Sequence, residues 1–174
     1  MIKDFYSYIK EEESDIISYS FLTITNALYY VYFDPYQYAL HVEDYPNLLK
    51  LGYGFGFERM SKPSNWVEDP LIFSTISQIV FDFIQDNGNE VVLLYHCDNS
   101  DQKQKGRDKI FEDWYRKSEL NTEIFKKRIS ICHRNSEDQE ITMFMGYLTS
   151  ESNQSKSQIE EEFQFFAENL VDKH

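Results

Sequence analysis

The sequence is short of cysteine, and it has neither a long apolar run nor a signal peptide. Its two cysteines, Cys97 and Cys132, are too few for a disulfide framework among 174 residues, which indicates a reducing compartment. No apolar stretch approaches the roughly 20 residues that a membrane-spanning helix needs. The first residues, 1–5, lack the continuous apolar region of a signal peptide. We therefore expect a cytoplasmic protein with no membrane partner.

Basic charge is also scarce, because 17 Lys and Arg stand against 30 Asp and Glu, for a net charge of −13. A charge of this sign repels nucleic acids and anionic membranes at long range, although it permits a local basic site. Aromatic residues are plentiful, with 14 Phe and 13 Tyr, and such side chains dominate cores and interfaces. We expect one domain over residues 1–174, in which residues 1–14 form either a short helix or a mobile terminus.

The hydrophobic periodicity predicts an α+β fold. The expected helices are 70–86, 102–118 and 157–172, and the expected strands are 17–24, 28–33, 51–59, 90–97, 124–133 and 139–148. Residues 34–46 contain Pro35 and Pro46 without a clear period, which favours a loop. The order ββ-β-α-β-α-ββ-α predicts a mostly antiparallel twisted sheet of five or six strands, with the helices packed mainly on one face.

Residues 51–59 alternate aromatic side chains with Gly52, Gly54 and Gly56. A strand with a bare face indicates that something approaches its backbone closely, and a packed helix or a bulge explains this more simply than a ligand. The spacing G-x-G-x-G is not a dinucleotide fingerprint. In the helix at 70–86, Asp69 is the expected N-cap, and Asn87-Gly88 is the expected end.

Positive charge gathers in residues 101–134. This segment has ten basic and six acidic residues, a local net charge of +4, so the other 140 residues carry −17. Such asymmetry suggests an interaction surface, whereas the plainer interpretation is a solvated helix face that pairs with acidic neighbours. Lys103 and Arg107 lie one helical turn apart, and Ser100 or Asp101 is the expected helix cap. Together they could hold phosphate or another anion.

Two carboxylates, Asp98 and Asp101, flank the turn between the apolar strand at 90–97 and this helix. They could bind Mg²⁺ or act as acid and base, or they could simply shape the turn and cap the helix. His96-Cys97 and Cys132-His133 contain the residue types of a zinc site. Adjacent strand residues point to opposite faces, however, and this argues against zinc.

No motif for a nucleophile, a P-loop or a metalloprotease occurs in the chain, so we assign no catalytic residue, no metal site and no cofactor. An aromatic cluster in the first predicted hairpin could stack nucleic-acid bases, but it lies in an acidic part of the chain. Core packing explains the rings more simply. The members of this cluster are Tyr19, Phe21, Tyr29, Tyr30 and Tyr32.

Residues 95–115 resemble a family of small uncharacterised bacterial proteins. The residues that carry the resemblance are Cys97, Asp98, Asp101, Gln104, Arg107, Phe111 and Trp114. The tripeptide Tyr19-Ser20-Phe21 and the pair Tyr45-Pro46 are similar too, so the likeness spans most of the chain. It implies no activity, but it draws attention to the corner between Asp98 and Arg107. The family favours Arg where this chain has Lys103, which weakens bidentate anion binding there.

Two functional hypotheses follow. The first is a non-enzymatic protein-interaction or regulatory module, with an acidic body and a basic helix that docks another protein. The second is an enzyme or ligand sensor for a phosphorylated small molecule or nucleic acid. We favour the first hypothesis, because no catalytic signature stands out. The candidate binding residues for either are Asp98, Asp101, Lys103, Gln104, Arg107 and Trp114.

Overall fold

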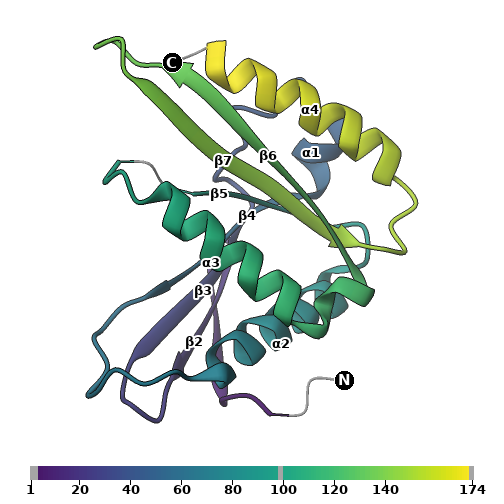
Figure 1. Cartoon of the computed structure of the whole chain (residues 1–174). Helices are drawn as coiled ribbons and strands as arrows, with labels where there is room; N and C mark the ends of the chain where they lie inside the picture. The colour runs from purple at the N-terminus through teal and green to yellow at the C-terminus, as the bar shows by residue number, and fades with distance from the viewer. Residues whose placement is uncertain (1–3, 98–99, 173–174) are drawn as a thin grey trace.

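The computed structural model describes residues 4–97 and 100–172. Within them the chain forms a seven-stranded mixed sheet, four α-helices and a short 3₁₀ helix at Glu119–Thr122 (Figure 1). The strands are β1 (Tyr8–Glu13), β2 (Ile16–Leu22), β3 (Leu28–Asp34), β4 (Gly52–Arg59), β5 (Val92–Cys97), β6 (Ile124–Arg134) and β7 (Glu140–Ser150). The helices are α1 (Pro46–Leu51), α2 (Pro70–Asn87), α3 (Gln104–Lys117) and α4 (Lys156–Asp172).

The strand order across the sheet is β1-β2-β3-β4-β5-β7-β6. β4 and β5 run parallel, and the other neighbouring pairs are antiparallel. The parallel pair requires a crossover, which α2 provides, because two parallel strands cannot be joined by a tight turn. The predicted α+β class and the mostly antiparallel sheet are confirmed.

Helices lie on both faces of the sheet. α2 and α3 pack on one face over a core that includes Val31, Phe33 and Trp114. α1 and α4 pack on the other face over a second core that includes Leu94, Tyr147 and Phe163. In Figure 1, α4 lies at the top beside β6 and β7, far from β2 and β3 at the bottom. The second layer therefore covers only part of its face.

The glycines of β4 are covered by the chain itself. A side chain at Gly52 would collide with the backbone carbonyl of Leu48, because Gly52 is the C-cap of α1 and follows it directly. The backbone of Gly54 lies under Gln37, and that of Gly56 lies under the ring of Tyr32. The alternate aromatic residues point into the core beneath α2 and α3.

Local signals place the helix ends of α2 where we expect them. The carboxylate of Asp69 accepts a hydrogen bond from the Leu71 amide (3.1 Å), as an N-cap does. Gly88 ends the helix with a φ of 98°, a conformation that glycine adopts without steric cost.

Two predictions are wrong in detail. The sheet has seven strands instead of five or six, because residues within 1–14 form β1, which is neither a helix nor a mobile terminus. The helices cover both faces instead of mainly one. The loop predicted at 34–46 agrees with the turns at residues 35–45. The short helix α1 that follows was not predicted, and its Asn47 and Leu48 amides donate to the carboxylate of Glu162 in α4.

The cap of α3 also differs from the prediction. The helix begins at Gln104 with Lys103 as its N-cap residue and without a side-chain cap. Asp101 lies before it and accepts a hydrogen bond from the Lys103 amide (3.1 Å). The expected cap at Ser100 or Asp101 is therefore wrong, because the turn after β5 uses more residues than we assumed.

A matched pair of glycine substitutions tests the packing between β5, β6 and β7. In Gly146→Ala the new methyl group collides with the Lys127 carbonyl and the Tyr95 hydroxyl, so we expect a loss of about 2 kcal/mol in unfolding free energy. Gly106→Ala meets open space on α3 and should gain about 0.5–1 kcal/mol. Urea denaturation monitored by circular dichroism measures both, and an unchanged midpoint for Gly146→Ala would contradict this packing.

Candidate functional site

The corner after β5 brings several of the predicted site residues together. Arg107 donates two hydrogen bonds to the carboxylate of Asp101, at 2.6 and 2.7 Å. This charge-assisted bond from the guanidinium holds the pKa of Asp101 well below its usual range. Lys103 lies between the two residues at the start of α3. Asp98, also predicted here, lies outside the described residues.

The other two predicted residues bind the protein itself. The side-chain amide of Gln104 donates to the Thr142 carbonyl (3.3 Å), which links α3 to β7. Trp114 is fully buried, and its indole N–H donates to the Ser77 hydroxyl (3.0 Å) of α2. In this arrangement Trp114 is a core residue that joins two helices and presents no surface to a ligand.

Much of the positive charge in residues 101–134 is paired with carboxylates. Asp108, which is buried, accepts two hydrogen bonds from Arg128 (2.7 and 2.6 Å). These bonds tie α3 to β6, and they raise the pKa of Arg128. Further ion pairs engage other basic residues: Arg107–Asp101, Arg116–Asp113, Lys126–Glu112, Lys127–Glu160 and Arg134–Asp138. Six of the ten basic residues are therefore neutralised locally.

The remaining four form what we call the lysine face, which consists of Lys103, Lys105, Lys109 and Lys117. All four are exposed, and none forms an ion pair with the carboxylates whose positions are described. Ile110 lies on the same solvent side of α3 and is 51% exposed. A cationic surface with an apolar residue therefore persists on an otherwise acidic molecule.

A second surface, which the sequence analysis missed, lies on the opposite side of the sheet. We call it the open face; it is the part of the α4 side of β1–β4 that no helix in the described chain covers. Its residues are Ile9, Glu11, Glu13, Ile16, Ser18, Ser20, Leu22, Leu28, Tyr30, Tyr32, Asp34 and Glu58. The alternation of side chains along each strand indicates two sides. Which residues of the four strands share one side is known only once the strand pairing is known.

The aromatic residues of the first hairpin point to two different sides of the sheet. Tyr19, Phe21 and Tyr29 point toward α2 and pack in or against the core there. Tyr30 and Tyr32 point the other way, with their ring centroids 6.2 Å apart. The charged side chains around these two rings are carboxylates, so a nucleic acid would be repelled from the surface where bases could stack.

The histidine and cysteine pairs do not converge on a metal site. His96 lies on the α4 side of the sheet and Cys97 on the α3 side. His96 Nδ1 is hydrogen-bonded to the buried hydroxyl of Tyr38 (2.6 Å). In the described residues, no group of three or more His, Cys, Asp and Glu could hold a metal ion.

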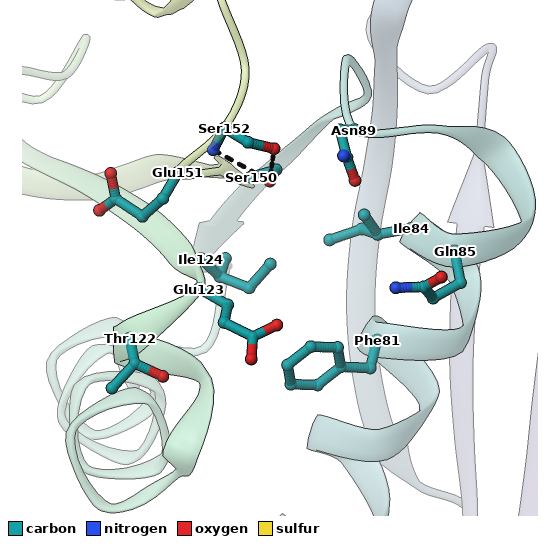
Figure 2. A pocket seen from close by; sticks show the side chains of 10 residues that line it. All are labelled: Phe81, Ile84, Gln85, Asn89, Thr122, Glu123, Ile124, Ser150, Glu151 and Ser152. Atoms are coloured by element: carbon teal, nitrogen blue, oxygen red, sulfur yellow. Dashed lines mark hydrogen bonds between the residues drawn. The ribbon is translucent and has the colours of Figure 1, made fainter. Parts of the chain in front are cut away.

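One surface hollow, shown in Figure 2, lies between the end of α2 and the strands β6 and β7. It encloses about 300 Å³. The carboxylate of Glu123 points into it toward Phe81, whereas Glu151 points away (Figure 2). Ser150 and Ser152 are hydrogen-bonded to each other at its rim (2.8 Å). Its lining has no histidine, cysteine or lysine, so it does not pair a nucleophile with a strong general base.

The chain belongs to a family of unknown function (DUF6169), whose model matches residues 68–165. The matched segment runs from just before α2 into α4 and includes the whole lysine face, whereas the open face lies outside it. No curated protein and no solved structure matches this chain. None of the described helices has the length and apolarity to cross a membrane.

The two cysteines should react at very different rates. Burial raises the pKa of the Cys97 thiol to about 11, so this thiol is protonated at neutral pH as well as shielded. Cys132 is exposed. We expect Ellman's reagent at pH 8 to modify Cys132 quickly and Cys97 only after denaturation. Cys132→Ser should abolish the fast reaction, and rapid labelling of Cys97 in this variant would refute the burial.

The Asp101–Arg107 pair predicts a pH dependence. Because the folded pKa of Asp101 is lowered, its stabilising effect is present above the unfolded value of about 3.9. The effect is lost as the pH falls through the lower folded value. NMR titration of the Asp101 carboxyl carbon should show the depressed pKa, and Arg107→Gln should raise it toward the ordinary value. An unchanged titration in this variant would mean that the pair does not form in solution.

Proposed function

We propose that this protein is a non-enzymatic, cytoplasmic protein-interaction module whose lysine face docks an acidic segment of another protein. The observation that carries the proposal is the set of four exposed lysines at the start of α3 and along it, none of which forms an ion pair with a carboxylate among the described side chains. The molecule has a net charge of −13, so a persistent cationic patch creates an oriented field that can steer an acidic partner.

The surroundings of the lysine face suit a protein partner. Ile110 supplies an exposed apolar contact between the lysines, and interface energy usually concentrates in a few such residues within a polar rim. The side of α3 beneath is anchored by Phe111, Trp114 and the Asp108–Arg128 bond, so the surface is rigid. Both cysteines are free thiols, which supports a reducing compartment.

The alternative, an enzyme or ligand sensor for a phosphorylated small molecule or nucleic acid at the Asp101–Arg107 corner, has weaker support. The guanidinium of Arg107 is already bound by Asp101 in bidentate geometry. A phosphate group would have to displace that carboxylate, and a charge-assisted bidentate pair is among the stronger polar contacts.

A fluorescent peptide with Glu on one helical face and Leu on the other tests the lysine face by anisotropy. We expect saturable binding that weakens with salt and falls about tenfold in Lys105→Glu/Lys109→Glu, because two attractions become repulsions. The matched control is Lys50→Glu/Lys62→Glu, which makes the same change of charge on exposed residues elsewhere and should bind like the wild type.

Two outcomes would overturn the proposal. The first is no saturable binding of the acidic peptide, or equal binding by both double variants. The second is tighter binding of an RNA or DNA oligonucleotide through the same lysines, which would assign the surface to nucleic acid. Thermal denaturation of each variant ensures that a loss of binding is not a loss of folding.

A further inference from the structure

We infer that the open face is a second docking site, which accepts a cationic amphipathic helix of a partner protein. This inference is independent of the lysine face, because the two surfaces lie on opposite sides of the sheet. It rests on the exposure, the charge and the shape of the side chains that β1–β4 present on the side of α4.

Large apolar side chains of the open face are in contact with water. Ile9 is 66% exposed, Leu22 is 54% exposed, and Leu28, which faces Leu22 across β2 and β3, is 38% exposed. Tyr30 and Tyr32 are half-buried beside them. A contiguous exposed patch of this kind marks an interaction site more often than scattered apolar residues do.

The charged strand residues of the open face all have the same sign. They are Glu11, Glu13, Asp34 and Glu58, and the described strand residues on this side of β1–β4 include no lysine or arginine. The strand lysine of β1, Lys10, points to the other side and pairs with Asp86 of α2 (3.0 Å). A partner must therefore bring both apolar groups and positive charge.

The registers of β1, β2 and β3 place short side chains between longer ones. Ser20 lies between Ile9 and Tyr30, and Ser18, which is itself buried, lies between Glu11 and Tyr32. At these two positions the side chains of β2 are shorter than those of the flanking strands. A helix that lies across the sheet can therefore approach the backbone of β2 more closely there than the backbones of β1 and β3.

Helices of this chain cover the other parts of the sheet. α4 lies over β5, β7 and β6 with Ile159, Phe163 and Phe166 pointing inward. On the opposite side, helices lie under both halves of the sheet, α2 beneath the first strands and α3 beneath the last ones. A partner helix on the open face would fill the remaining position of the α4 layer (Figure 1).

A second copy of this chain fits the open face less well. Its exposed cationic helix is α3, whose apolar stripe is already buried against its own sheet. α3 offers Ile110 as its exposed large apolar residue, which cannot fill a surface bordered by Ile9, Leu28 and Tyr30. A helix with a complete apolar stripe and lysines or arginines beside it matches the surface better.

The test uses a fluorescent peptide with Leu on one helical face and Lys on the other. We expect saturable anisotropy, with amide shift changes in the NMR spectrum confined to β1–β4. Glu11→Lys/Glu58→Lys should weaken binding about tenfold, whereas Glu137→Lys/Glu140→Lys, at the far β6–β7 turn, should not. Tyr30→Ser should weaken binding similarly, in contrast to Leu40→Ser, which removes an exposed apolar residue outside the open face.

Three results would overturn the inference. The first is equal binding by the two charge variants. The second is equal binding of a scrambled peptide with the same composition but no apolar stripe, since this would show attraction by charge alone. The third is self-association of the protein in sedimentation equilibrium that Glu11→Lys/Glu58→Lys and Lys105→Glu/Lys109→Glu each abolish, because the occupant would then be a second copy.

Discussion

The rest of the structure depends on β4, whose backbone other segments of the same chain approach very closely. Its three glycines let the Leu48 carbonyl, Gln37 and Tyr32 lie directly on the strand backbone, while the alternate aromatic residues fill the core below. A side chain at any of these glycine positions would displace the group that lies on the strand backbone there. The layer of α1 and α4 therefore ends within β4, because α1 meets Gly52 at its start, whereas Gly54 and Gly56 lie under the side chains of Gln37 and Tyr32.

Some helices and strands are stabilised mainly by contacts between residues that are close in the sequence, and local patterns predict these elements. The stripe, the cap and the glycine end of α2 were sufficient to predict it, because these contacts are all short-range. β1 was missed because Lys10 and the glutamates 11–13 resemble a solvated helix or tail. Tyr8 and Lys10 bind Asp82 and Asp86 of α2, far along the chain. α1 was missed for a similar reason, since Glu162 stabilises its first turn.

The same distinction applies to the candidate sites. The gathering of positive charge near α3 is visible in the sequence, but its neutralisation depends on the register of β6. That register places Arg128 beside Asp108 and Lys126 beside Glu112. The open face needs even more information, because Ser18, Tyr32 and Glu58 share a surface only once three strand pairings are known. Periodicity gives each strand two sides, and only the fold decides which side a helix covers.

The two proposed surfaces have opposite signs on one small molecule, and their placement explains why they need not cancel each other. The lysine face lies outside the layer formed by α3, and the open face lies on the other side of the sheet. The sheet and α3 lie between the two surfaces, and an α-helix with its side chains is by itself about 10–12 Å across. Exposed charges are largely screened beyond about 8 Å at physiological ionic strength. Each surface can therefore attract a partner of its own complementary charge. If both proposals hold, the protein can bind an acidic partner and a cationic partner on opposite sides at the same time. The rigid core between the two surfaces then fixes the separation of the two partners.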